Sequence, residues 1–280
     1  MSGPGAEGGA RRGRLLLVPN TLDLGTFGAG PPPDLRAVLP QAVIETAARL
    51  THWVCENARS TRAFLKRVDA VVPLAMPLQE LDVQELPRPP KGRSAAAAPD
   101  LGALLAPALA GHDLGLISEA GLPAVADPGA ALVAAAHAAG VPVEPLSGPS
   151  SLLLALAASG LNGQSFAFVG YVPQEAAAQA QRLRELEALS RRWDQTQLMI
   201  ETPYRNASLL RGLLAALAPA TRLSISCGLT LEGGWTRTDT VARWRAAPVE
   251  LPGDRPAVFA VLADGREAGC SPAGRKGGGG

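Results

Sequence analysis

Hydroxyl and carboxylate side chains gather in two turns of this chain that are rich in glycine and proline. These side chains belong to Ser118, Glu119, Asp127, Ser150 and Ser151. Glycine lets backbone N–H and C=O groups approach a ligand closely, and small side chains leave room for it. Turns of this kind suit a ligand with both polar and apolar parts, which the hydroxyl and carboxylate groups can hold by hydrogen bonds and charge.

Each of these side chains also has a purely structural interpretation. Ser150 stands before an apolar stretch with helical spacing, where it can act as a helix N-cap. Asp127 precedes Pro128 and can simply initiate a turn. Taken one at a time, the residues leave both interpretations open, whereas the ordered string of the two turns is much more specific.

Two short strands are expected to position these turns. The apolar run at residues 114–117 ends abruptly at the first turn, and an alanine-rich helix at 130–139 follows it. A second strand at 141–146 then leads into the second turn, which opens an apolar helix at 150–159. A strand, a crossover helix and a parallel strand place both turns at the carboxyl ends of neighbouring strands, where open α/β sheets bind ligands.

The string GLISEAGLPAVADPG, which starts at Gly115, and the later SGPSS resemble a known signature. It is the Ser-Asp-Ala-Gly-Thr-Pro-Gly-Ile-Ser-Asp-Pro-Gly and Pro-Gly-Pro-Ser pair of the tetrapyrrole methylase superfamily, the class III S-adenosylmethionine-dependent methyltransferases. GYVP from Gly170, ETPYR from Glu201 and LTLEG from Leu229 resemble further motifs in the same order. The chain is most similar to the branch that methylates a ribose 2′-hydroxyl in small-subunit ribosomal RNA, over residues 15–262.

This resemblance implies an α/β fold of two αβα domains with mainly parallel open sheets, and S-adenosylmethionine in the cleft between them. We expect the domains at residues 14–162 and 163–264, flanked by disordered tails at 1–13 and 265–280. A homodimer is implied in the same way. The implied cofactor-binding residues are Pro19, Ser118, Glu119, Ala120, Val125, Ala126, Asp127, Ser150, Ser151, Tyr171, Glu201 and Thr202.

The methyl group of S-adenosylmethionine is already activated, so such an enzyme mainly has to align the acceptor and exclude water. A ribose hydroxyl would also benefit from a base, for which Glu56 and Glu201 are the candidates. Arg59 can hold an RNA phosphate. The competing interpretation of Glu56 and Arg59 is a carboxylate at a helix start and a surface ion pair.

Departures from the RNA-methylating branch leave the acceptor open. The first loop, at residues 19–22, lacks the inner glycine of that branch, and Asn57 stands where the branch has an acid. Glu119 replaces an aspartate of the family signature. A paralogue with a small-molecule acceptor, or a protein that binds the cofactor or RNA without turnover, therefore remains an alternative.

Composition restricts the possible partners and location. The chain has 26 Lys and Arg against 25 Asp and Glu, a net charge of +1, so RNA must be contacted by a local basic patch. The arginines of a predicted helix at 175–193 offer such a patch, although a solvated helix face is the commoner explanation.

The absence of an apolar run of about 18 residues and of a signal peptide predicts a cytoplasmic protein without membrane contact. Widely spaced cysteines and histidines predict no metal site.

Two further expectations concern local structure. The recurrent prolines of residues 73–99 predict a long loop without any regular element. Asn206 is expected to cap a helix that begins at Ala207.

Overall fold

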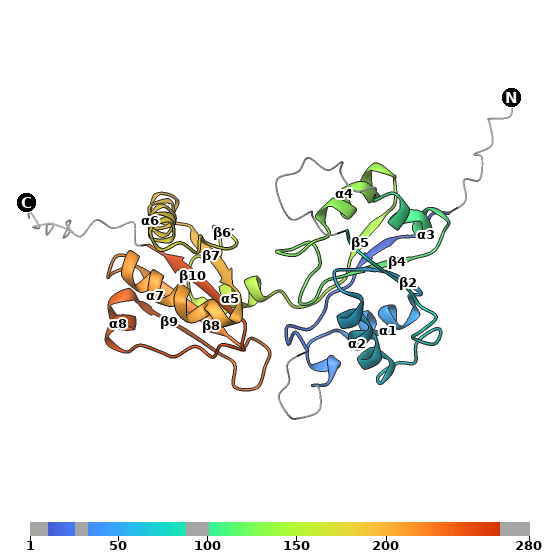
Figure 1. The fold of residues 1–280 in the computed structure, drawn as a ribbon, viewed down its shortest axis with the longest axis horizontal. Helices are drawn as coiled ribbons and strands as arrows, with labels where there is room; N and C mark the ends of the chain where they lie inside the picture. Colours follow the sequence, from blue (N-terminus) through green and yellow to red (C-terminus); the bar gives the residue numbers. More distant parts are fainter. Residues whose placement is uncertain (1–10, 26–32, 88–100, 264–280) are drawn as a thin grey trace, which may run out of the picture. The chain divides into compact units, whose positions relative to one another are not determined.

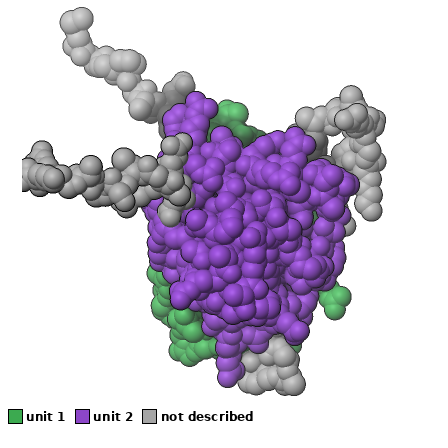
Figure 2. Space-filling model, turned by 90° about the vertical axis from the view of Figure 1, so that its left-hand side faces the viewer, with its two compact units in different colours: residues 1–151 green, residues 152–280 purple. Residues whose placement is uncertain are grey.

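The computed structural model describes residues 11–25, 33–87 and 101–263. Backbone contacts divide the chain into two compact units, Met1–Ser151 and Leu152–Gly280, which Figure 2 shows in green and purple. Each unit is built on one five-stranded sheet. The predicted disordered tails fall largely outside the described residues, but Gly13 is buried and its amide donates a hydrogen bond of 2.8 Å to the Ala108 carbonyl.

The sheet of the first unit is parallel throughout, with the strand order β3-β2-β4-β1-β5. Its strands are β1 (Leu15–Leu17), β2 (His52–Cys55), β3 (Asp82–Glu85), β4 (Leu114–Ile117) and β5 (Val143–Pro145). The central strand β4 is buried along its whole length. Because the strands are parallel, the loops that follow them share the carboxyl edge of the sheet.

Helices cover both faces of this sheet, which makes the unit an αβα sandwich (Figure 1). They are α1 (Gln41–Arg49), α2 (Ala58–Asp69), α3 (Ala106–Leu109) and α4 (Ala130–Ala138), with short 3-10 helices at Leu35–Ala37 and Ala103–Leu105. Alternate side chains of β2 point to opposite faces of the sheet, because side chains in a strand repeat with a period of two. Trp53 packs in the core under α1 and α2, whereas Val54 packs with α3 and α4.

The second unit contains a mixed sheet in the order β6-β7-β10-β8-β9. Its strands are β6 (Phe166–Phe168), β7 (Thr196–Glu201), β8 (Arg222–Cys227), β9 (Trp235–Thr240) and β10 (Ala257–Leu262). Only β6 and β7 pair in parallel, and the remaining neighbours are antiparallel. The helices are α5 (Ser151–Ser159), α6 (Ala176–Trp193), α7 (Asn206–Ala216) and α8 (Val241–Ala246).

The predicted α/β class is confirmed. The expected mainly parallel pairing holds for the first sheet, whereas the second sheet is mixed. The strand expected at 114–117 coincides with β4, and the alanine-rich helix differs from α4 by one residue at its end. The helix α5, which we expected in the first domain, packs its Leu152 and Leu156 against Leu198 and Val258 of the second sheet. Its apolar sequence shows that it is buried, but does not show against which sheet.

Two local expectations were wrong. The proline-rich segment contains a strand, β3, whose residue Asp82 pairs in register with His52 of β2. Because β3 is an edge strand, its backbone pairs on one side only, and prolines nearby and polar side chains are tolerated. The rest of that segment, 88–99, lies outside the described residues.

Asn206 is not a cap but the first residue of α7, and its Nδ2 donates to the Arg255 carbonyl at 3.0 Å.

Within the described part of the chain, no helix is long and apolar enough to span a bilayer.

Candidate functional site

The loops that follow β1 and β4 are joined at the carboxyl edge of the first sheet. Asn20 and Gly121 exchange backbone hydrogen bonds of 2.9 and 3.2 Å in an isolated antiparallel bridge. The side chain of Asn20 is buried and donates to the carbonyls of Ser118 and Glu119, each at 3.1 Å. The first loop is therefore fixed to the backbone that carries two of the predicted cofactor-binding residues.

The loop after β5 lies against the same place. A Cβ atom added to Gly148 would meet the Cβ of Pro19 at 2.2 Å, and one added to Gly121 would meet the Pro149 carbonyl oxygen at 3.4 Å. Ser150 is buried directly after this contact. Pro19, Ser118 and Ser150 thus come from three loops that pack together. The two signature turns were expected on neighbouring strands, which was wrong: β1, and with it the loop of Pro19, lies between β4 and β5.

The loop between β4 and α4 has an unusual backbone. Ala124 and Ala126 have φ angles of 65° and 64°, in the left-handed region that alanine adopts at a cost of about 1 to 2 kcal/mol per residue. Between them Val125 is 45% exposed. Strain of this kind persists where the surrounding structure enforces it and is concentrated at binding sites, so the loop is a candidate to contact a ligand.

Three carboxylates gather at this edge of the sheet. The amide of Glu119 donates to Glu56 Oε2 at 3.4 Å, and burial raises the pKa of Glu56. Burial and then the charge of Glu56 raise the pKa of Asp127 to about 6, although a hydrogen bond with Ser118 opposes the shift. Negative charges that repel one another in a partly buried place favour a positively charged ligand. Across the described residues, no group of three His, Cys, Asp or Glu side chains has the geometry to hold a metal ion.

The raised pKa of Asp127 predicts how stability depends on pH. The folded state binds this proton more tightly than the unfolded chain, so stability falls as pH rises from about 4 to about 6. An Asp127→Asn variant should therefore be more stable than the wild type at pH 7.5, by on the order of 1 kcal/mol after solvent screening. Urea unfolding at pH 4 and pH 7.5 measures this, and an equal difference at both pH values would contradict it.

A hollow of about 520 Å³ opens between the first loop and α2. Asn57 caps α2, because its Oδ1 accepts from the amides of Arg59 and Ser60 at 2.9 and 3.4 Å. Arg59 and Glu119 are the two predicted site residues that line the hollow. Asn57 therefore does more than replace the acid that the RNA-methylating branch has at this position, because Asn57 also caps the helix that carries Arg59.

The floor of this hollow is held by a buried ion pair. Arg67 Nη1 lies 3.0 Å from Asp23 Oδ2 and donates to Thr21 Oγ1 at 3.2 Å. Sequence reasoning missed Asp23, Arg67 and the bridging role of Asn20. A polar residue in the loop after a buried strand could have indicated Asn20, which follows the end of β1 at Leu17 after Val18 and Pro19. No sequence pattern links an aspartate to an arginine on a distant helix.

The remaining predicted residues lie in the second unit. β6 and β7 are parallel neighbours, so Tyr171 and Thr202 follow strands that end at one edge of that sheet. The carboxylate of Glu201 is already engaged: Oε2 lies 3.2 Å from Arg205 Nε, and Oε1 accepts from the Thr202 amide at 2.9 Å. Tyr171 is 60% exposed. Glu201 is therefore a less suitable base than Glu56.

The sequence of this chain is similar to those of known proteins. A family model described as tetrapyrrole (corrin/porphyrin) methylases matches residues 28–243. The chain is 37% identical over 122 residues to a protein of Vibrio cholerae, and 39% identical over 138 residues to one of Mesorhizobium japonicum. Both are named ribosomal RNA small subunit methyltransferase I. The matched stretches are 44% and 49% of this chain and 41% and 46% of the relatives, so the match spans less than half of either relative.

Among solved structures, the fold is similar to that of the methyltransferase CobJ. The TM-score is 0.52 at 18% sequence identity, and the match covers 92% of this chain and 97% of that chain. At this identity the likeness concerns the fold alone.

Proposed function

Because the chain belongs to the tetrapyrrole (corrin/porphyrin) methylase family, we propose that it is a methyltransferase that uses S-adenosylmethionine and methylates small-subunit ribosomal RNA. The observation that carries the proposal is the joining of three strand-end loops around partly buried carboxylates, at the sheet edge where ligands bind. The RNA acceptor is supported by the names of the relatives from Vibrio cholerae and Mesorhizobium japonicum.

The residues of this edge fit such a cofactor. It is a cation with a polar nucleoside, and the edge offers the carboxylates of Glu119 and Asp127 beside three loops that Gly121 and Gly148 allow to pack closely together. When bound, it supplies a methyl group already activated for transfer. We assign binding in the first unit to Pro19, Ser118, Glu119, Ala120, Val125, Ala126, Asp127, Ser150 and Ser151, and in the second unit to Tyr171, Glu201 and Thr202.

Glu56 is our candidate for the residue that accepts the proton of the acceptor hydroxyl. Its carboxylate is partly buried, its pKa is raised by that burial, and the Glu119 amide orients it from 3.4 Å. A base with a raised pKa takes up a proton more readily than an exposed carboxylate does. We assign Arg59, which is exposed at the start of α2, to hold an acceptor phosphate.

The experiment that tests this function is a labelled-methyl assay. The purified protein is incubated with radiolabelled S-adenosylmethionine and total RNA from cells that lack it, and the labelled RNA is digested to nucleosides. Label in a 2′-O-methylnucleoside of small-subunit ribosomal RNA is the expected result. Cofactor binding by calorimetry without any transfer to RNA or to cell extract would instead indicate a binding protein without turnover.

We also propose, from the family resemblance, that the protein acts as a homodimer in the cytoplasm. Light scattering after size-exclusion chromatography gives the mass in solution, which should be twice that of the chain. A monomer mass across the working concentration range would contradict the dimer.

A bulky residue at position 120 is expected to weaken cofactor binding. Ala120 is partly exposed in the loop after β4, and its carbonyl accepts from the Ser118 hydroxyl at 3.1 Å. An Ala120→Trp side chain would fill the space assigned to the cofactor, and a cost of about 1.4 kcal/mol is a tenfold rise in Kd. Calorimetry measures it, with Ala134→Trp on the exposed face of α4 as the control. Equal affinities of the two variants would place the pocket elsewhere.

A further inference from the structure

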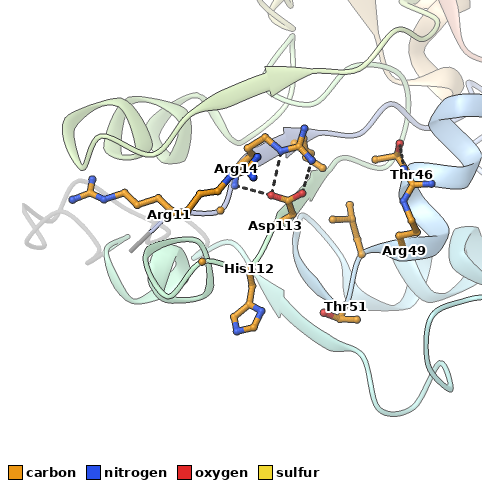
Figure 3. Close-up of a pocket in the computed structure, with 12 residues that line it drawn as sticks. Arg11, Arg14, Thr46, Arg49, Thr51, His112 and Asp113 are labelled. Atoms are coloured by element: carbon orange, nitrogen blue, oxygen red, sulfur yellow. Dashed lines mark hydrogen bonds and ion pairs between the residues drawn. The ribbon is translucent and has the colours of Figure 1, made fainter. Parts of the chain in front are cut away.

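A second hollow, of about 460 Å³, lies at the opposite edge of the first sheet, where the strands begin. Figure 3 shows its lining, in which the chain before β1, the chain before β4 and the end of α1 contribute side chains. The polar lining residues include Arg11, Arg14, Arg49, Thr51, His112 and Asp113. None of these residues belongs to the loops assigned to methyl transfer.

This hollow carries an excess of positive charge. Arg14 is neutralised, since it lies 2.5 Å from Asp113 Oδ2 and 2.7 Å from Glu144 Oε2. Arg49 donates to the Thr46 hydroxyl at 3.2 Å. Across the described residues, Arg11, Arg12 and Arg49 line the hollow without forming an ion pair. Arg12 donates a hydrogen bond to the Ala139 carbonyl, so Arg11 and Arg49 are the guanidinium groups that remain available, in a chain whose net charge is only +1.

The backbone that presents these groups is fixed before any ligand binds. Gly13 donates to the Ala108 carbonyl at 2.8 Å, and the Arg14 carbonyl accepts from Leu114 at 2.8 Å. A Cβ atom on Gly13 would meet the His112 carbonyl oxygen at 2.0 Å, so the basic segment lies directly on the chain that enters β4. Arg11 therefore lies two residues before an ordered part of the sheet edge, and Arg49 is the last residue of α1, which reduces the entropy lost on binding. Figure 3 shows Arg11 and Arg49 on opposite sides of the Arg14–Asp113 pair, so they can hold different phosphates of one backbone.

We propose that this hollow binds backbone phosphates of the RNA, through Arg11 and Arg49, as an anchoring site separate from the methyl-transfer edge. Guanidinium groups bind phosphate by paired N–H donors, and phosphate contacts supply most of the affinity of proteins for nucleic acids. His112 adds an imidazole to the same lining. That the phosphate belongs to RNA rests on the proposed function, whereas the phosphate-binding chemistry does not.

The test compares two double variants that lose the same charge. Arg11→Gln with Arg49→Gln removes the available groups of the hollow, and Arg211→Gln with Arg243→Gln removes two exposed cations of α7 and α8, outside the loops and the helix assigned to RNA. Fluorescence anisotropy of a fluorescein-labelled oligouridylate gives Kd over a range of salt concentrations. We expect the first variant to bind on the order of tenfold more weakly, with the slope of log K against log salt reduced by about 1.4 for two lost contacts.

Equal weakening by the two variants, or no weakening by the first, would overturn the site. Calorimetric titration with inorganic pyrophosphate distinguishes the two sources of phosphate, and we expect pyrophosphate to bind the wild type much more weakly than the oligouridylate does. Pyrophosphate binding as tight as that of the oligouridylate, and lost in the first variant, would show a site for a free phosphate group, and the RNA assignment would fail. Calorimetry with S-adenosylmethionine, expected to be unchanged in the first variant, shows that the fold is intact. If the wild type transfers no labelled methyl group to RNA, the proposed function is contradicted. The anisotropy comparison of the two variants still decides whether the anchoring site exists.

Discussion

A Glu56→Gln variant is expected to transfer methyl groups to RNA about 100-fold more slowly than the wild type. Glutamine keeps the shape of the side chain but cannot accept a proton, and positioned bases typically contribute a factor of about 100 or more. In single-turnover assays the wild-type rate should rise with pH through the raised pKa of Glu56, because only the deprotonated carboxylate acts as a base. The rate of the variant should lack this rise.

The matched control is Glu201→Gln. The carboxylate of Glu201 pairs with Arg205 and accepts from the Thr202 amide. Its loss should therefore lower the free energy of unfolding but leave the pH dependence of the transfer rate unchanged. A wild-type pH profile in the Glu56 variant, together with a flat profile in the Glu201 variant, would transfer the role of base to Glu201.

Gly148→Ala is expected to damage the cofactor site without involving any reacting group. The new Cβ would lie 2.2 Å from Cβ and 2.4 Å from Cγ of Pro19, and the rigid proline ring cannot rotate away. The two loops must separate, at a cost of about 1 to 3 kcal/mol in stability. Because Pro19 and Ser150 belong to these loops, we expect Kd for S-adenosylmethionine to rise at least about tenfold, the equivalent of 1.4 kcal/mol.

Urea unfolding and calorimetry measure the two effects. Gly163→Ala is the control, since a Cβ there has no neighbour within 4 Å. A Pro19→Gly change added to Gly148→Ala removes the colliding ring and should recover part of the lost affinity. If Gly148→Ala matches its control in both measurements, the loops do not pack as the structure shows.

Local sequence was sufficient to predict the strands and helices that carry the site. The run LGLI ends at Ser118 because apolar residues give way to turn residues, and this change needs no knowledge of distant contacts. The same reasoning placed the strand-end turns of β4 and β5 at one edge of a sheet, since a crossover helix makes the two strands parallel. β3 was missed because an edge strand is defined by its partner, β2, rather than by its own pattern.

What the sequence by itself determined about this protein is therefore its class, its family resemblance and the edge of the sheet where its signature turns lie. The tertiary structure decided which of these groups interact. It joined Asn20 to the loop of Ser118, paired Arg67 with Asp23, and distinguished Glu56 from the engaged Glu201. These contacts link residues that are far apart in the chain. Their energies depend on the distance between the groups and on their burial, and neither can be read from the spacing of residues in a sequence.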